Sequence, residues 1–302
     1  MTSFFTSRYS ATLSSLQLPF FRWASLRRWV IRRTANILLP VYYRLTDAKT
    51  GIGTKDTTKA EGRLIVSLSS FPARISRVWI TLESLLRQTH KPDMIILWLS
   101  KLQFPNEMSD LPDQLVALLD RGLTIRFVDK DYRSHRKYLY VLKEYPKDIL
   151  FTVDDDLIYP PCLLEDVWQM HLSHPSAIIA SYAHGKEYDT SGHIRPYLEW
   201  RNNSMSGPFF FCSGGGTLFP AGCLHVDTTD IDAALNLCPT ADDVWLNVMA
   251  LKQGTSVVHS LKRWLPLPVL SVSSEKLSTN NVYEHGNDRQ IAAVQAYYDI
   301  LL

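Results

Sequence analysis

Residues 149–160 constrain this chain most, because an apolar strand runs directly into three carboxylates. The first five of these residues suit a strand that is covered on both faces, as in a parallel sheet. Asp154, Asp155 and Asp156 follow at once, and two prolines then delay the next helix. The chain must therefore place three like charges at the end of a buried strand, where a cation or basic side chains have to offset their repulsion.

The triplet predicts a metal site. Side chains alternate along a strand, so we expect Asp154 and Asp156 on one side of the strand end and Asp155 on the other, provided that the extended geometry persists. Carboxylate oxygens are hard ligands that suit Mg²⁺ or Mn²⁺, ions that commonly keep positions for water and phosphate. The alternative is a solvated acidic turn. We favour the metal because the triplet leaves a strongly apolar strand.

Charge is divided unevenly along the 302 residues, whose formal net charge is +2. Residues 1–46 contain seven arginines and no acid, whereas the rest of the chain contains 25 basic and 30 acidic residues. A basic leader on a mildly acidic body favours an anionic surface as partner at one end. The body shows no basic stripe with interleaved aromatic residues, so we do not expect a nucleic-acid partner.

Residues 16–45 interleave these arginines with tryptophans and aliphatic residues. On a helical wheel Trp23, Leu26, Val30 and Ile37 share one stripe. No window of about 20 residues is free of charge, which argues against a spanning helix. A basic amphipathic segment with tryptophans is typical of the membrane interface, so we expect a cytoplasmic protein that is peripheral on the inner face of the cell membrane. An organellar transit peptide and a plain packed helix are the alternatives.

The four cysteines indicate no chemistry of their own. They form neither a Cys-x-x-Cys pair nor a zinc-binding spacing. The sequence shows no secretory signal pattern, so we expect the thiols to be reduced in the cytosol.

From residue 63 onward, strand and helix patterns alternate. Strands are expected at 63–69, 94–99, 123–128 and 149–153, with helices at 74–88, 111–121 and 136–145. This alternation predicts an α/β fold with a mostly parallel sheet flanked by helices, preceded by a polar, glycine-bearing linker. Ligands of such sheets bind beyond the carboxyl ends of the strands, which is where Ser69, Ser70 and Asp129 fall together with the acid triplet.

The second half of the body is less regular. A helix near 162–173 and a strand near 177–182 precede three glycines that adjoin an aromatic strand near 209–212. Glycine permits positive φ and close approach of the backbone to a ligand, although a bulge or hairpin turn explains the run equally well. A helix near 240–253 opens with two acids, which are also ordinary helix-dipole partners. A further strand is expected at 256–260.

Taken in order, the alternating strands and helices, the acid triplet, the glycine triplet and the acid pair resemble the GT-A class of nucleotide-sugar-dependent glycosyltransferases. The opening of the body resembles bacterial, family 2-like enzymes that build surface polysaccharide or lipopolysaccharide, through Ser67–Ile75, Thr81–Thr89 and Lys91–Asp93. The likeness covers residues 63–260. It implies a GT-A, Rossmann-like domain over 63–270, after a basic membrane-surface segment at 1–46 and the linker at 47–62, with 271–302 as a tail that packs on or closes over the site.

The resemblance also implies roles for single residues. Asp154 and Asp156 match the D-x-D element, which holds Mn²⁺ or Mg²⁺ and the donor diphosphate. Asp243 matches the general base that deprotonates the acceptor hydroxyl, with Asp242 as the competing member of the pair. His259 is carried as the metal-binding histidine that many members have after the base, although neither it nor His285 has a well-matching spacing and a packed histidine is the alternative. Donor contacts are assigned to Ser69, Ser70, Asp129, Lys137, Asp154, Asp155, Gly214, Gly215 and Gly216.

The activity that the resemblance implies is a metal-dependent, hexosyltransferase-like transfer from a nucleotide-sugar to a hydroxyl of a lipid-linked or polysaccharide acceptor. Inversion is favoured because a positioned carboxylate base suits direct displacement. One alternative is a sugar-phosphate nucleotidyltransferase, which would normally need a glycine-rich, basic phosphate loop where this chain has Ser69-Ser70-Phe71-Pro72. The other is a catalytically silent, membrane-associated scaffold.

Overall fold

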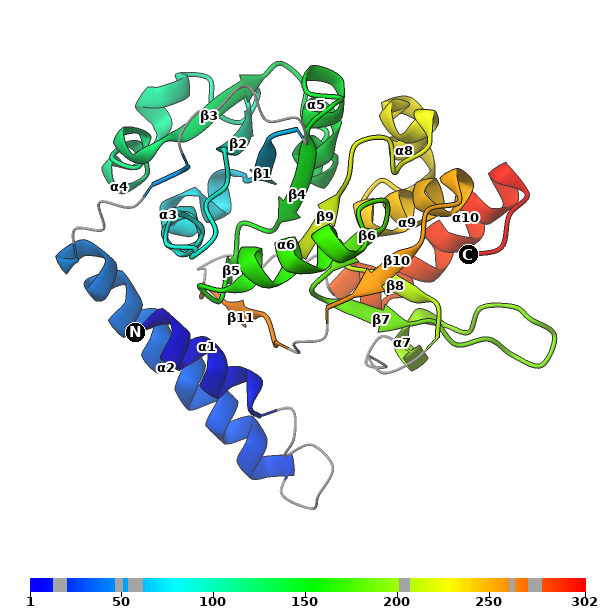
Figure 1. Cartoon of the computed structure of the whole chain (residues 1–302), viewed down its shortest axis with the longest axis horizontal. Helices are drawn as coiled ribbons and strands as arrows, with labels where there is room; N and C mark the ends of the chain where they lie inside the picture. The colour runs from blue at the N-terminus through cyan, green and yellow to red at the C-terminus, as the bar shows by residue number, and fades with distance from the viewer. Residues whose placement is uncertain (13–20, 47–50, 54–61, 201–206, 261–263, 271–278) are drawn as a thin grey trace.

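The computed structural model describes residues 1–12, 21–46, 51–53, 62–200, 207–260, 264–270 and 279–302. Most of the predicted linker and part of the predicted tail lie outside these residues. Figure 1 shows a pair of N-terminal helices beside an α/β body, with the C-terminus on the opposite side of that body.

A seven-stranded sheet forms the centre of the body, in the order β10-β6-β9-β4-β1-β2-β3. Its strands are β1 (Leu64–Ser69), β2 (Met94–Ser100), β3 (Leu123–Val128), β4 (Ile149–Val153), β6 (Ile178–Ala180), β9 (Gly215–Phe219) and β10 (Val257–His259). β9 runs antiparallel to its neighbours β4 and β6, and the other strands run parallel to one another. The predicted α/β fold with a mostly parallel sheet is confirmed, and it agrees with the expected Rossmann-like GT-A class.

Helices cover both faces of the sheet, because successive residues of a strand point to opposite sides. On β1, Leu64, Val66 and Leu68 join one core cluster, whereas Ile65 joins the other. The first cluster is closed by α1 (Thr2–Ser10), α2 (Phe21–Leu45), α3 (Pro72–Leu86), α4 (Asp113–Val116) and α6 (Leu163–Ser173). The second is closed by α5 (Arg136–Glu144), α7 (Tyr197–Trp200), α8 (Ile231–Leu237), α9 (Asp242–Gln253) and α10 (Gly286–Tyr298).

Two small antiparallel pairs extend the body beyond the main sheet. β5 (Leu157–Ile158), directly after the acid triplet, pairs with β11 (Leu267–Pro268). β7 (Ala183–Gly185) pairs with β8 (Phe209–Phe211). Both pairs follow strands of the main sheet at its carboxyl edge, so they surround the place where a ligand is expected.

Two sequence predictions are corrected. The helix expected at 111–121 is wrong: α4 has four residues and is followed by a 3₁₀ turn at Leu119–Arg121. Pro112 precedes its first turn and Gly122 ends the segment at φ +96°, which leaves too little chain for a stable longer helix. The strand expected at 177–182 ends at Ala180, because Ser181 turns to donate hydrogen bonds to the carbonyls of Gly215 (2.6 Å) and Gly216 (2.7 Å).

The N-terminal helices pack on the body rather than apart from it. Ala35, Leu39 and Tyr43 on α2 are buried in the first core cluster, together with Phe5 on α1. The Thr2 hydroxyl lies 2.9 Å from the Tyr43 hydroxyl, which joins α1 to α2. Over the described part of the chain, no helix combines the length and the apolar character needed to cross a bilayer.

Candidate active site

The acid triplet lies at the carboxyl edge of β4, where the strand turns into β5. The extended geometry assumed from the sequence does not persist, because Asp155 and Asp156 form a turn. The three side chains still fall into the two expected groups, which differ in exposure. Those of Asp154 and Asp156 are 45% and 31% exposed, and that of Asp155 is 5% exposed. Two of the three carboxylates are therefore accessible to a ligand.

Asp155 fastens the turn to the rest of the body. Its carboxylate accepts hydrogen bonds from the Ser70 hydroxyl at 2.5 Å and the Arg74 guanidinium at 2.6 Å. Its backbone carbonyl accepts one from the Thr81 hydroxyl at 2.9 Å. Burial raises the pKa of Asp155, although Arg74 acts in the opposite direction. Because its oxygens are hydrogen-bonded to these protein groups, Asp155 anchors the turn on the buried side of the site.

Arg74 is a site residue to which sequence reasoning gave no role. It lies in the first turn of α3, and its Nη1 is 3.1 Å from Asp156 as well as bonded to Asp155. Burial raises the pKa of Asp156 to about 7, against the effect of Arg74. The position of Arg74 in the sequence could have identified it, because an arginine soon after the first strand of a parallel sheet lies near the carboxyl edge.

Lys137 joins the acid triplet to the acid pair. It lies in the first turn of α5, is 4% exposed, and places its Nζ 3.0 Å from Asp154 and 2.9 Å from Asp242. Burial alone would lower the pKa of Lys137, but the surrounding carboxylates raise it above its ordinary value. This permanently charged ammonium bridges two carboxylates that lie 88 positions apart in the sequence. The sequence placed Lys137 in a basic turn but did not predict the bridge.

The acid pair at the start of α9 contains two different carboxylates. The Ser213 hydroxyl donates to Asp242, and the Ser213 amide donates to Asp243, both at 2.7 Å. Burial acts to raise the pKa of Asp242, but Lys137 and its other partners lower it to about 2. Burial and the neighbouring Asp242 raise the pKa of Asp243 to about 7. One acid stays ionised, whereas the other can accept a proton near neutral pH.

The glycine run lies directly against the triplet. The Gly214 carbonyl accepts hydrogen bonds from the Asp154 amide at 3.1 Å and the Tyr159 hydroxyl at 2.6 Å. A Cβ at Gly214 would lie 1.9 Å from a carboxylate oxygen of Asp154, so no larger residue fits without moving that side chain. Gly216 has φ +94°, a region that disfavours other residues. Gly215 begins β9. The run is thus a turn that also sets the position of Asp154.

Two other predicted residues lie at the outer strands of the sheet, away from the central strand β4. Asp129 follows the edge strand β3, has an 85% exposed side chain and forms an ion pair with Lys101 at 2.9 Å. His259 lies on β10 at the other edge, where its ring packs 5.2 Å from the ring of Phe209. The Nδ1 atom of His285 lies 2.9 Å from a carboxylate oxygen of Asp288. Ser69 ends β1, half-buried, beside the triplet's strand.

Asp154 and Asp156 suit a divalent cation as a two-carboxylate site. Among the residues that the structure describes, no cluster of three or more His, Cys, Asp or Glu side chains is arranged to hold a metal, so His259 does not complete such a cluster there. Mg²⁺ is commonly bound by one or two carboxylates, with substrate phosphates and waters filling its other positions. Two accessible carboxylates at a strand end agree with that mode, and Gly214 places no Cβ against the Asp154 carboxylate.

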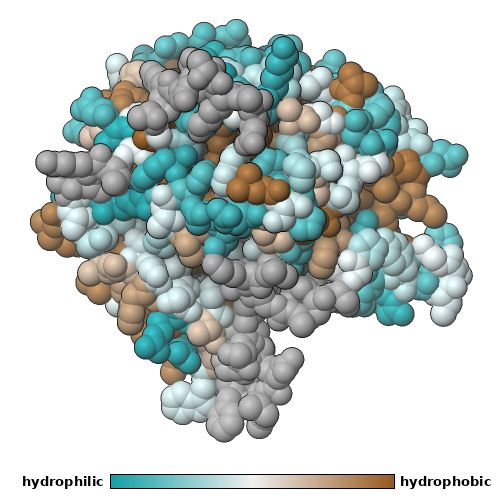
Figure 2. All heavy atoms as spheres, in the orientation of Figure 1, coloured by the Kyte–Doolittle hydropathy of each residue, from teal (hydrophilic) through white to brown (hydrophobic). Residues whose placement is uncertain are grey.

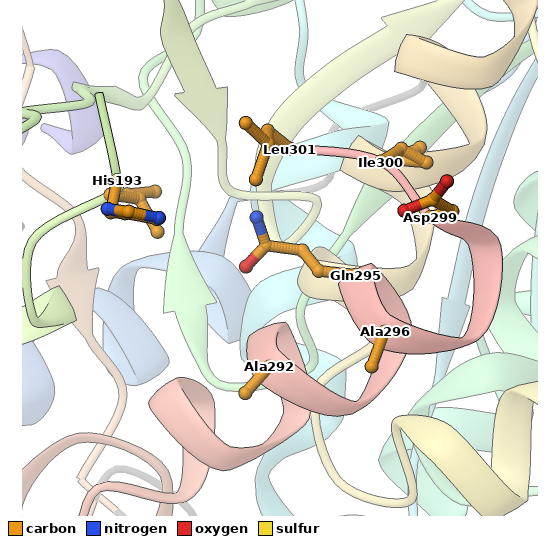
Figure 3. A pocket seen from close by; sticks show the side chains of 8 residues that line it. His193, Ala292, Gln295, Ala296, Asp299, Ile300 and Leu301 are labelled. Atoms are coloured by element: carbon orange, nitrogen blue, oxygen red, sulfur yellow. The ribbon is translucent and has the colours of Figure 1, made fainter. Parts of the chain in front are cut away.

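A cavity of about 330 Å³ lies elsewhere, between the end of α10 and the loop that contains His193 (Figure 3). Gln295 and Asp299 line it with several aliphatic side chains. None of the residues assigned to the donor, the metal or the base is among those that line it. This cavity is therefore not the candidate active site.

Comparisons with known proteins assign this chain neither a family nor an activity. No protein-family model and no curated protein matches the sequence. Among solved structures, the mannosyltransferase PcManGT from Pyrobaculum calidifontis, in complex with GDP-Man and Mn²⁺, is similar over 89% of this chain and 74% of its own, with 12% identity and a TM-score of 0.48. The 4-diphosphocytidyl-2C-methyl-D-erythritol synthase from Anaerococcus prevotii is similar over 74% of this chain and 99% of its own, with 14% identity and a TM-score of 0.43. Similarity this weak carries no argument about activity.

Proposed function

We propose that this protein is a glycosyltransferase that moves a sugar from a nucleotide-sugar to a hydroxyl of a lipid-linked or polysaccharide acceptor, with inversion. The observation that carries the proposal is the Lys137 bridge, which puts accessible carboxylates suited to a diphosphate-bound cation beside a carboxylate that titrates near neutral pH. Direct displacement needs both parts: a group that holds the leaving diphosphate and a base that takes the acceptor proton.

In the proposed reaction, Asp243 accepts the proton of the acceptor hydroxyl as the new bond from that oxygen to the anomeric carbon forms. The bond from the anomeric carbon to the diphosphate breaks at the same time, and the nucleoside diphosphate leaves with the electron pair. Asp242 stays ionised against Lys137 and keeps the pKa of Asp243 raised, so that the base matches neutral pH.

Asp154 and Asp156 would hold Mn²⁺ or Mg²⁺, which when bound offsets the negative charge that develops on the leaving diphosphate. Arg74 and Lys137 support the same carboxylates from the protein side, and they orient both acids before substrate arrives. Ser69, Asp129 and the glycine run remain the proposed direct contacts of the donor. Ser70, which is buried, would act on the donor site through its hydrogen bond to Asp155.

The acceptor class and the location belong to the same proposal. A lipid-linked acceptor would be presented at a membrane surface, and the basic, acid-free residues 1–46 support a peripheral position on the inner, anionic face of the cell membrane.

Residues 279–302 include α10, which reaches the site through Gln290. The side-chain oxygen of Gln290 accepts hydrogen bonds from the amides of Thr240 (3.1 Å) and Ala241 (3.0 Å), just before the acid pair.

A donor screen tests the proposal. The purified chain is incubated with UDP-, GDP-, CDP- and dTDP-sugars with and without Mn²⁺, and release of the nucleoside diphosphate is measured. We expect slow hydrolysis of one donor class with Mn²⁺ and its loss in Asp156→Asn. A matched control is Asp120→Asn, an exposed acid on the 3₁₀ turn Leu119–Arg121, which precedes β3 and so lies at the amino end of that strand.

Other outcomes of the screen decide against the proposal. Pyrophosphate formed from a nucleoside triphosphate and a sugar phosphate would identify a nucleotidyltransferase. Absence of any nucleotide binding, measured by the shift of the unfolding temperature with each nucleoside diphosphate and Mn²⁺, would favour the silent scaffold.

A further inference from the structure

We propose that the outward face of α2 is a docking surface for the interface of an anionic membrane, and that the fold ties this surface directly to the candidate active site. The proposal rests on the membrane part of the proposed function and specifies its surface. It is testable without turnover, so its failure is distinct from failure of the proposed sugar transfer.

α2 carries two apolar stripes on opposite faces. The inner stripe packs on the body through Ala24, Ala35, Leu39 and Tyr43. The outer stripe recurs at helical spacing and remains exposed: its members are Trp23 (70%), Leu26 (51%), Val30 (46%), Ile37 (66%), Val41 (50%) and Leu45 (79%). Residues three, four and seven apart lie on one face of a helix, so these six side chains form a continuous outer stripe.

The outer stripe belongs to a concentration of exposed apolar side chains. Ten of the nineteen large hydrophobic residues that are exposed in the described structure fall within residues 1–45. Single exposed apolar residues are normal, but a contiguous group of them marks an interaction surface. Figure 2 shows apolar side chains beside polar ones on the lobe that α1 and α2 form.

Positive charge accompanies the stripe. Arg27, Arg33 and Arg44 are exposed and flank it on the helical wheel, and residues 1–46 contain no acid. The Arg33 guanidinium lies 5.6 Å from the centre of the Trp29 ring. An apolar stripe with tryptophan and flanking arginines suits the boundary between acyl chains and anionic phosphates.

This chemistry favours a membrane over the other partners. A nucleic acid would pair with the arginines but would leave the aliphatic stripe in water. A second copy of the chain would cover the stripe, but a symmetric contact would bring two acid-free arginine faces together. An anionic bilayer satisfies both the apolar and the charged part.

The inner face of α2 connects the surface to the acid triplet. The Asn36 side chain donates to the Pro268 carbonyl at 3.0 Å and accepts from the Leu270 amide at 2.7 Å. Between them, the Val269 amide donates to the Asp156 carbonyl at 2.7 Å, and β11 pairs with β5. One backbone segment, residues 268–270, thus connects α2 to Asp156, a proposed ligand of the cation. Docking through the outer stripe would therefore fix the orientation of the site relative to the membrane.

The test measures co-sedimentation of the full chain with vesicles of phosphatidylcholine alone and of phosphatidylcholine mixed equally with phosphatidylglycerol. We expect binding to the mixed vesicles that weakens as salt rises. The double variant Trp23→Ser/Ile37→Ser should bind roughly tenfold or more weakly, because each substitution removes apolar burial at the interface. The control Leu102→Ser/Val226→Ser removes side chains that are 74% and 79% exposed elsewhere, and should bind as the natural chain does.

Charge reversal tests the electrostatic half. Arg27→Glu/Arg33→Glu should abolish the preference for phosphatidylglycerol, whereas Arg195→Glu, at an exposed arginine of the body, should keep it. Quenching of the natural chain's tryptophan fluorescence by brominated lipid gives a readout that needs no variant, and we expect quenching in mixed vesicles.

Equal vesicle binding by the stripe variant and its control would overturn the proposal, as would absence of quenching. A vesicle-free dimer that the stripe variant dissociates would assign the surface to a second copy instead. Displacement of bound vesicles by short RNA at low concentration would assign it to nucleic acid.

Discussion

The acid triplet and the acid pair place carboxylates at the same edge of the sheet but neutralise them differently. In the triplet, Arg74 contacts two acids and Lys137 contacts the third. In the pair, Lys137 contacts Asp242, whereas Asp243 accepts a hydrogen bond from a backbone amide. Contact with Lys137 keeps Asp242 ionised, whereas Asp243, which touches no cation, and Asp156, where burial outweighs Arg74, can each take up a proton near neutral pH.

This difference divides the work of the proposed reaction. Accessible, cation-supported carboxylates suit the binding of a charged donor, and a desolvated carboxylate next to an ionised one suits proton transfer. Because a single ammonium serves both groups, the two functions are coupled through Lys137.

Lys137→Met should cause the largest loss of stability. It leaves Asp242 buried without its cation, and breaking a buried ion pair on one side costs about 3 kcal/mol or more; Asp154 adds less because it can turn toward solvent. Denaturant unfolding measures the change. Lys143→Met, at an exposed position on the same helix, should change stability by less than about 0.5 kcal/mol. Equal effects of the two variants would show that the bridge contributes nothing.

Asp243→Asn should lower sugar transfer by roughly 10²–10⁴-fold, the usual contribution of a general base. The amide keeps an oxygen to accept the Ser213 hydrogen bond, so the fold should persist. Asp242→Asn should cost less if Asp242 only tunes its neighbour. Transfer rates at saturating donor decide the roles: an inactive Asp242→Asn with a normal Asp243→Asn would exchange them.

Gly214→Ala should lower transfer by roughly 10²-fold, although no acid is changed. The new Cβ would displace the Asp154 carboxylate, and a misplacement of about 1 Å can cost that much. Gly222→Ala is a useful comparison, because Gly222 has positive φ, unlike Gly214, but has nothing near its Cβ position. A similar loss of transfer in both variants would mean that displacement of Asp154 is not responsible.

The pH dependence gives the smallest effect. Because the pKa values of Asp243 and Asp156 are both about 7, transfer should fall at least about tenfold for each pH unit below that value and level off above it. The raised pKa also means that Asp243 favours the folded state at low pH, and that this contribution is lost as pH rises from about 4 through 7. Asp243→Asn should therefore unfold at a higher temperature than the natural chain at pH 8, but not at pH 4. A natural profile that stays flat down to pH 5 would exclude Asp243 as the titrating base.

Much of the fold could be predicted because its signals are local. The apolar runs of β1, β2, β3 and β4 identify parallel strands by composition, and the polar residues that follow them identify the edge where ligands bind. The antiparallel insertion of β9 between β4 and β6 left no such signal, since it depends on pairing between distant segments. The short α4 shows that hydrophobic periodicity overestimates helix length where a proline and a glycine enclose a brief segment.

The site was predictable in its residue types but less so in its contacts. The triplet, the glycine run and the acid pair are visible because each is a cluster in the sequence. Arg74 and the Lys137 bridge depend on α3 and α5 being brought to the strand ends, which no local pattern specifies. The location of His259 was unpredictable for the same reason. The sequence identifies its strand, β10, but not that β10 lies at the edge of the sheet opposite to β3.

The most direct test of the division between the two acid groups is calorimetric titration of three variants with the nucleoside diphosphate that the donor screen identifies, in the presence of Mn²⁺. We expect Asp154→Asn and Asp156→Asn to lose at least roughly tenfold in affinity, because each removes a charged ligand. Asp243→Asn should bind the diphosphate as tightly as the natural chain and still fail to transfer sugar. Loss of diphosphate binding in Asp243→Asn, or full affinity and full transfer in Asp154→Asn and Asp156→Asn, would contradict this division.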